Sequence, residues 1–140
     1  MAKSLDEIAA SLQEEVDRDA RETLSPQVFA RWKNPVGFGR MENPDGSSHI
    51  QGTCGPVEFF LMVEASRVKK AGFVSSGCAA TLASASMAVE LCQGRELSRA
   101  ATLSGEEIAR GLGGLDAHDR RTADSVAQAV RLAAENALGK

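Results

Sequence analysis

The sequence has no run of about 18 consecutive apolar residues, the length that a membrane-spanning helix requires. Its first residues, MAKSLDEIAASLQ, also lack the apolar stretch of a secretory signal peptide. The net charge is -3 and the lysines and arginines are scattered, so the basic stripe of a nucleic-acid-binding surface is missing. We therefore expect a cytoplasmic protein that binds neither membranes nor nucleic acids.

Machinery for ordinary hydrolysis is also missing, because no Ser/His/Asp series and no paired acidic motif stands out. The glycine-rich segment 111–114 follows a helical pattern without the Lys and Ser/Thr of a phosphate loop, which indicates a helix stop. The two histidines, His49 and His118, are interpreted as surface residues, with a metal role for His118 as the alternative. We expect a protein that is not an enzyme.

The chain does contain clear helix signals at its start. Ser4 and Glu7 form a capping box, and apolar residues then recur on one helical face, at Leu5, Ile8, Leu12 and Val16. This pattern predicts an amphipathic helix over residues 4–23. We treat residues 1–24 as an N-terminal extension and residues 25–140 as the main domain.

The main domain mixes strand and helix patterns in blocks. Helices are predicted at 25–32, 78–94, 104–114 and 116–138, and strands from residue 48, over 57–63 and over 67–75. Without βαβ alternation, this order predicts an α+β fold with about five helices in the whole chain. Both faces of the strand 57–63 carry apolar residues, so we expect the N-terminal helix or a second protomer to cover one of them.

Three cysteines in a reducing compartment indicate free thiols, metal ligands or redox groups. Cys54 lies in a glycine-rich turn before a strand, and Cys78 lies at a helix start, where backbone donors favour the thiolate. The alternative for Cys78 is an inert, half-buried residue. Cys92 continues an apolar stripe about 21 Å further along the same helix, so it cannot share a metal with Cys78 and is predicted to be a core residue.

Several segments occur in an order that resembles the NifU/IscU-type iron–sulfur cluster assembly scaffolds. They are FARWKNPVGFGR, NPDGSSHIQGTCGP, AGFVSSGCAATLASAS, LCQGRELSRAATLSGEEI and GLGGLDAHDRRTADSVAQAV. The resemblance implies a mainly antiparallel three-stranded sheet packed with helices. It also implies a scaffold that receives sulfur from a cysteine desulfurase and passes a transient iron–sulfur cluster, such as [2Fe–2S], to recipient apo-proteins.

The resemblance further implies which residues hold the cluster. Cys54 and Cys78 match the first two family cysteines and are the predicted metal and cluster ligands. Pro56 stands where the family has an aspartate, while Thr122 and Arg121 stand at the third cysteine and at its preceding histidine. The Pro-Pro-Val-Lys loop that many scaffolds offer to a chaperone is also replaced, by LDAHDRR.

This reduced ligand set leaves three arrangements open. Two protomers could share a cluster or a zinc ion, an external thiol could complete the site, or the site could be retired in favour of protein contacts. Our leading hypothesis is a scaffold or carrier that uses Cys54 and Cys78. The alternatives are a metal-free interaction or regulatory module and a redox pair formed by the same two thiols.

Overall fold

Three antiparallel strands form a sheet in the order β1-β2-β3. They are β1 (Gly46–Gly52), β2 (Gly55–Glu64) and β3 (Arg67–Ser75). The structure is a computed structural model that describes residues 4–139, apart from the side chains of residues 20–23. The predicted antiparallel three-stranded sheet is confirmed. β1 starts two residues earlier than predicted, because Gly46 has no side chain to collide with Ala133 and Ala137 of the helix above it.

Six helices accompany the sheet: α1 (Leu5–Thr23), α2 (Pro26–Lys33), α3 (Ala79–Cys92), α4 (Leu97–Ala100), α5 (Gly105–Gly111) and α6 (Ala117–Leu138). The α+β class is therefore correct, and the predicted number of about five helices falls short by one. The missed helix, α4, has only four residues, so it is too short to produce a periodic apolar pattern. None of the helices within residues 4–139 has the length and apolar character needed to cross a bilayer.

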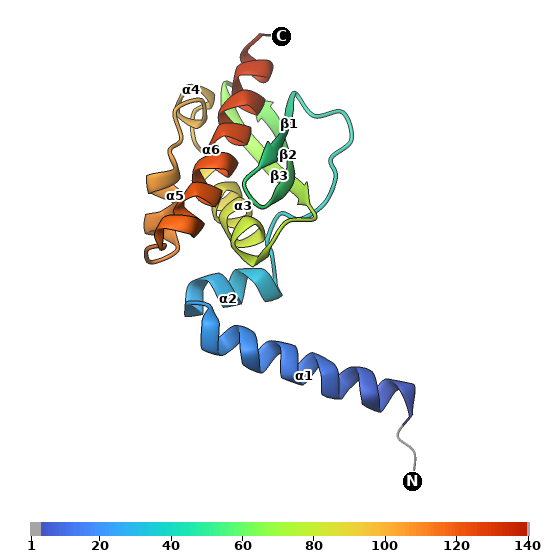
Figure 1. The fold of residues 1–140 in the computed structure, drawn as a ribbon. Helices are drawn as coiled ribbons and strands as arrows, with labels where there is room; N and C mark the ends of the chain where they lie inside the picture. Colours follow the sequence, from blue (N-terminus) through green and yellow to red (C-terminus); the bar gives the residue numbers. More distant parts are fainter. Residues whose placement is uncertain (1–3, 140) are drawn as a thin grey trace.

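The core lies between one face of the sheet and helices α3 and α6, which pack on the same side of it (Figure 1). Val57, Phe59 and Leu61 of β2 point into this core and are fully buried, as their alternation predicts. α3 is buried on nearly all sides, and its many alanines and serines let the sheet, α2, α5 and α6 approach it closely. α3 and α6 thus cover one face of the sheet while α1 packs on α2, so the expectation that the N-terminal helix covers the sheet is wrong. Cover by a second protomer stays a prediction.

The connection between α2 and β1 closes one edge of the sheet. Its residues 37–39 pair with β3, since the Gly39 N–H donates to the Phe73 carbonyl at 2.8 Å and the Phe73 N–H donates to the Gly37 carbonyl at 3.0 Å. The Phe38 ring meets the Phe73 ring edge to face, with the centroids 5.5 Å apart. This loop therefore brings the side chains of Phe38 and Arg40 alongside the sheet.

α1 projects away from the rest of the molecule (Figure 1). It contacts α2, where the Lys33 ammonium lies 2.9 Å from the Asp17 carboxylate. The predicted helix and its Ser4 cap are confirmed, with the Glu7 N–H donating to the Ser4 hydroxyl at 3.1 Å. Its apolar stripe is exposed, to the extent of 84% for Leu5.

Candidate functional site

Cys54 lies in the tight turn that joins β1 to β2. Gly52 and Gly55 pair across the turn, and Gly55 has φ of +118°, a backbone conformation that side chains disfavour. Thr53, the residue before Cys54, contacts Ser125 of α6, with 3.2 Å between their hydroxyl oxygens. The turn is therefore held against α6 and presents Cys54 at one end of the sheet.

Cys78 is the N-cap residue of α3, three residues after Ser75, the last residue of β3. Ser75 fixes this junction, because its hydroxyl donates to the Pro56 carbonyl at 2.6 Å and accepts from the Gly77 N–H at 3.0 Å. The Cys78 sulfur lies 3.5 Å from the Thr81 hydroxyl in the first turn of α3. The end of β3 is thereby tied to the start of β2, only two residues from Cys54.

The backbones of the two cysteine segments touch at a pair of glycines. A side chain on Gly77 would place its Cβ 2.7 Å from the Cys54 carbonyl oxygen, and one on Gly55 would lie 3.1 Å from the Gly77 Cα. Real Cβ atoms do not tolerate contacts as short as the first of these. The structure therefore brings together Cys54 and Cys78, which are 24 positions apart in the sequence.

The two thiols differ in their affinity for a proton. The neighbouring Cys78 sulfur, followed by burial, raises the pKa of Cys54. Burial alone would raise the pKa of Cys78, but hydrogen bonds from Cys54, from Thr81 and from the start of α3 outweigh it and lower that pKa. Cys78 is accordingly the more acidic thiol of the pair, and Cys54 is the one that holds its proton more tightly.

Cys92 is the third free cysteine, and it lies in the core at the far end of α3. It is fully buried, and burial raises the pKa of its thiol to about 12. The prediction that Cys92 is a core residue, separate from the other two thiols, is confirmed. His118 is exposed, as expected for a surface residue.

The three cysteines should differ in their rates of alkylation. Thiolate is the reactive form, so we expect iodoacetamide to modify Cys78 first, with half-maximal rate below the pH expected of an unperturbed thiol. Cys54 should follow at higher pH, and Cys92 should react only after denaturation. Peptide mass spectrometry of samples quenched across a pH series would measure this order. Modification of Cys54 before Cys78 would contradict the assignment.

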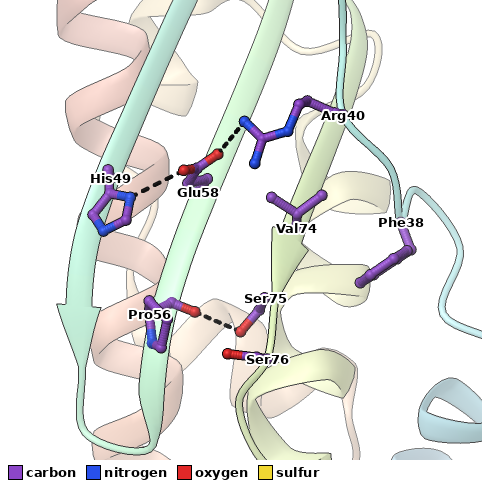
Figure 2. A pocket seen from close by; sticks show the side chains of 8 residues that line it. All are labelled: Phe38, Arg40, His49, Pro56, Glu58, Val74, Ser75 and Ser76. Carbon is purple, nitrogen blue, oxygen red and sulfur yellow. Dashed lines mark hydrogen bonds and ion pairs between the residues drawn. The ribbon is translucent and has the colours of Figure 1, made fainter.

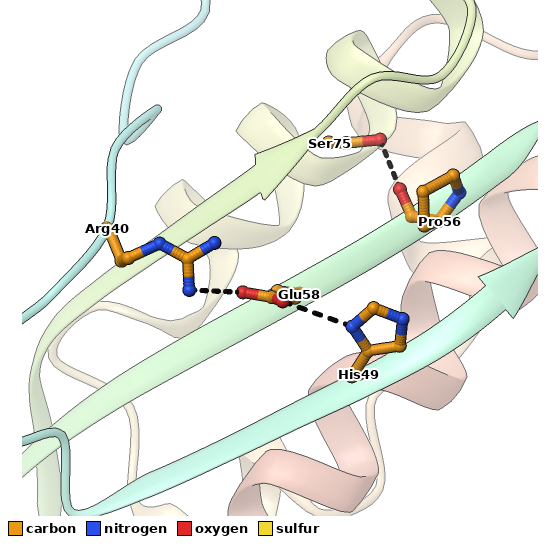
Figure 3. Close-up of polar contacts among 5 residues, drawn as sticks. All are labelled: Arg40, His49, Pro56, Glu58 and Ser75. Atoms are coloured by element: carbon orange, nitrogen blue, oxygen red, sulfur yellow. Dashed lines mark hydrogen bonds and ion pairs between the residues drawn. The ribbon is translucent and has the colours of Figure 1, made fainter.

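A shallow hollow of about 240 Å³ opens on the sheet beside the cysteine turn (Figure 2). Glu58 on β2 lies at its centre and contacts two basic side chains from different segments (Figure 3). Its carboxylate lies 2.7 Å from the Arg40 guanidinium and 3.1 Å from the His49 Nδ1. Hydrogen bonding to His49 and the charge of Arg40 lower the pKa of Glu58, which keeps it ionised. Sequence reasoning did not predict this group of three charged and basic side chains.

Comparison with known proteins adds the family. The model of the NifU-like N-terminal domain matches residues 23–140 of the chain. The chain belongs to this NifU-like family. The matched range leaves out nearly all of α1, whereas the proposed division of the chain at residue 24 stays a prediction.

Named relatives of this NifU-like chain include scaffold proteins. The iron–sulfur cluster assembly scaffold protein IscU 1 of Archaeoglobus fulgidus is 31% identical over 111 residues, which cover 78% of this chain and 72% of that protein. The bifunctional protein NifU/MnmA of Rubrobacter xylanophilus is 33% identical over 96 residues, 66% of this chain and 20% of that longer protein.

Solved structures support the NifU-like fold. A NifU-like N-terminal domain from Brucella abortus gives a TM-score of 0.63 at 14% identity, covering 83% of this chain and 94% of that one. A candidate scaffold of the SUF system from Fervidobacterium islandicum gives a TM-score of 0.65 at 14% identity, covering 79% and 96%. At these identities the likeness concerns the fold alone.

The position of the third family cysteine is closed in this NifU-like chain. Thr122 on α6 is 1% exposed and its hydroxyl finds no hydrogen-bond partner, while Arg121 beside it is exposed. Among the residues that the structure describes, no group of three or more His, Cys, Asp and Glu could hold a metal ion. Asp119, two residues before Arg121, contributes to the raised pKa of Cys54 and is the carboxylate that acts on this thiol. The site therefore offers two sulfur donors.

Proposed function

We propose that this NifU-like protein is an iron–sulfur cluster assembly scaffold or carrier, and that Cys54 and Cys78 are the residues that hold the sulfur or the cluster. The observation that carries the proposal is the contact between the Cys54 turn and the Gly77–Cys78 segment at one end of the sheet, which brings two free thiols together. Thiolates are the donors that iron–sulfur clusters and zinc use most. The lowered pKa of Cys78 makes it easier for this thiol to lose its proton when it binds iron.

Two sulfur donors suit a cluster that is held briefly. Two protomers contributing two cysteines each would supply the four thiolates of a [2Fe–2S] cluster, which makes a homodimer the simplest complete site. The same four donors would satisfy a tetrahedral zinc ion, so zinc is the competing metal. The protein transfers its cargo to another protein and is not an enzyme.

The partners follow from this role. A cysteine desulfurase supplies the sulfur, and recipient apo-proteins take the cluster, in keeping with the scaffold function named for the archaeal relative. Three free cysteines suit a reducing compartment, which supports a cytoplasmic location.

Anaerobic reconstitution tests the function. We expect protein incubated with ferrous iron and sulfide to develop the visible absorption of an iron–sulfur cluster, and to retain iron and sulfide in equal amounts after desalting. Native mass spectrometry would show whether the clusters are carried by dimers. Protein loaded with zinc is the control, because it lacks visible absorption.

The absence of a cluster under these conditions would reject the proposal. The closeness of the two thiols would then favour the redox pair, in which loss of two electrons and two protons to a disulfide oxidant joins Cys54 to Cys78. Non-reducing peptide mass spectrometry would identify that bond. If neither a cluster nor a disulfide forms, the metal-free interaction module is favoured.

A further inference from the structure

The hollow beside the cysteine turn ends close in sequence to the two thiols, and neither cysteine lines it. Pro56 and Ser76 line it, and each is two residues from a cysteine, Cys54 and Cys78 respectively. Pro56 and Ser76 lie at the end of the hollow nearest the turn, and Glu58 lies further along β2 (Figure 2). An elongated molecule in the hollow would therefore have one end near the thiol pair and the other near Glu58.

The end of the hollow away from the thiols offers donors for an anion. Glu58 uses one oxygen for Arg40 and the other for His49, which holds the two basic groups side by side. The Arg40 guanidinium has five N–H donors, and one of them donates to Glu58 in this contact. The Arg40 side chain is 68% exposed. The His49 side chain is 62% exposed, so its second ring nitrogen is accessible. A carboxylate can bind Arg40, and it can also bind His49 when the imidazole is protonated, because both ring nitrogens are then donors.

The Phe60 ring on the sheet also holds Arg40 in place. Its guanidinium lies 5.8 Å from the centre of the Phe60 ring on β2, a distance at which the ring face attracts a cation. Phe38, from the same loop as Arg40, supplies an apolar wall on the β3 side of the hollow (Figure 2). The basic groups are thus positioned before any ligand arrives, which reduces the entropy lost on binding.

We propose that this hollow binds a short thiol peptide with free carboxylates, whose sulfur supplies a further donor to a cluster held by Cys54 and Cys78. Arg40 and His49 bind a carboxylate of the peptide, Phe38 packs on its stem, and its thiolate reaches past Pro56 and Ser76. The peptide thiol loses its proton to solvent and binds iron as a thiolate, with no change in oxidation state. The inference rests on the proposed function, because the peptide sulfur adds a third donor to a cluster site that has two protein donors.

The competing small ligands fit less well. A simple inorganic anion would satisfy Arg40 and leave the thiol end unused, and an uncharged thiol would gain nothing from Arg40 and His49. The ionised Glu58 repels a ligand whose only charges are negative. The positive charge of Arg40 offsets the charge of Glu58. A molecule with both a carboxylate and a thiol would use both ends of the hollow.

Reconstitution in two different thiols tests the inference, with glutathione as the peptide thiol and 2-mercaptoethanol as a thiol without a carboxylate. In the unmodified protein we expect the visible absorption to persist about tenfold longer in glutathione, since one charge-assisted hydrogen bond is worth at least that factor. Arg40→Gln and His49→Gln should each remove most of this preference. Lys69→Gln is the matched control, because it removes a positive charge from β3 that is paired with Glu64.

A second readout needs no metal. S-methylglutathione carries the carboxylates and has no free thiol, so we expect it to shift the amide resonances of Glu58 and Ser76 in the metal-free protein, and to do so less in Arg40→Gln. Equal persistence of the cluster in both thiols, or shifts confined to other surfaces, would overturn the inference. Failure to form a cluster in any thiol would instead overturn the proposed function.

Discussion

Replacing Cys78 by serine should abolish cluster binding. A serine hydroxyl stays protonated at neutral pH and is a poor donor to iron, so the variant loses the thiolate that the start of α3 stabilises. We expect iron affinity to fall by about 100-fold or more, since even residues that only orient a ligand cost 10 to 100-fold. Cys54→Ser should weaken binding to a similar extent. Visible absorption and iron content after anaerobic reconstitution would measure both losses.

Cys92→Ala provides the control for thiol number. Cys92 lies in the core, so its loss should leave cluster absorption per folded molecule unchanged while lowering thermal stability. A loss of cluster in Cys92→Ala equal to that in Cys78→Ser would contradict the assignment of the site. Unchanged cluster binding in Cys78→Ser would do the same.

Truncating Phe73 should destabilise the fold more than any other change discussed above. Phe73 on β3 is fully buried between the sheet and the helices, and Phe→Ala in a core costs about 3 to 5 kcal/mol of unfolding free energy. Its ring neighbour Phe38 is 54% exposed, so Phe38→Ala removes the same atoms and should cost about 1 kcal/mol, mainly through the lost ring contact. Urea denaturation followed by circular dichroism would give both values.

The comparison between the two phenylalanines separates burial from ring chemistry. Equal losses in Phe73→Ala and Phe38→Ala would mean that the ring pair, rather than the core, holds the loop and the sheet together. Since domains of this size are stable by about 5 to 15 kcal/mol, Phe73→Ala should still be folded at low temperature. The predicted difference is therefore measurable.

Local patterns in the sequence predicted most of the fold. Period-two alternation placed Val57, Phe59 and Leu61 in the core, and caps such as Ser4 and Ser104 marked helix starts that the structure confirms. These features depend on neighbours within a few positions. The cover of the sheet depends on how distant segments pack, and for that reason the role given to the N-terminal helix was wrong.

The candidate site divides in the same way. Its cysteines were visible as residue types in a turn and at a helix start, and their adjacency came from the resemblance to known scaffolds. The contacts among Arg40, His49 and Glu58 were not predicted, because the three residues come from separate segments. Local sequence patterns do not determine how such segments align. The burial of Thr122 was within reach of sequence reasoning, since it lies four residues before Val126 on the buried face of α6.

The projection of α1 gives the molecule an uneven distribution of charge. Residues 5–19 of this helix contain six acidic side chains and one arginine, whereas residues 24–139 contain twelve side chains of each sign. Nearly all of the excess negative charge thus lies on an arm outside the cluster-binding domain (Figure 1). The electric field of a basic surface orients such a molecule before the two make contact. Its encounters with charged proteins therefore have a preferred orientation, and salt slows these encounters because it screens the charges.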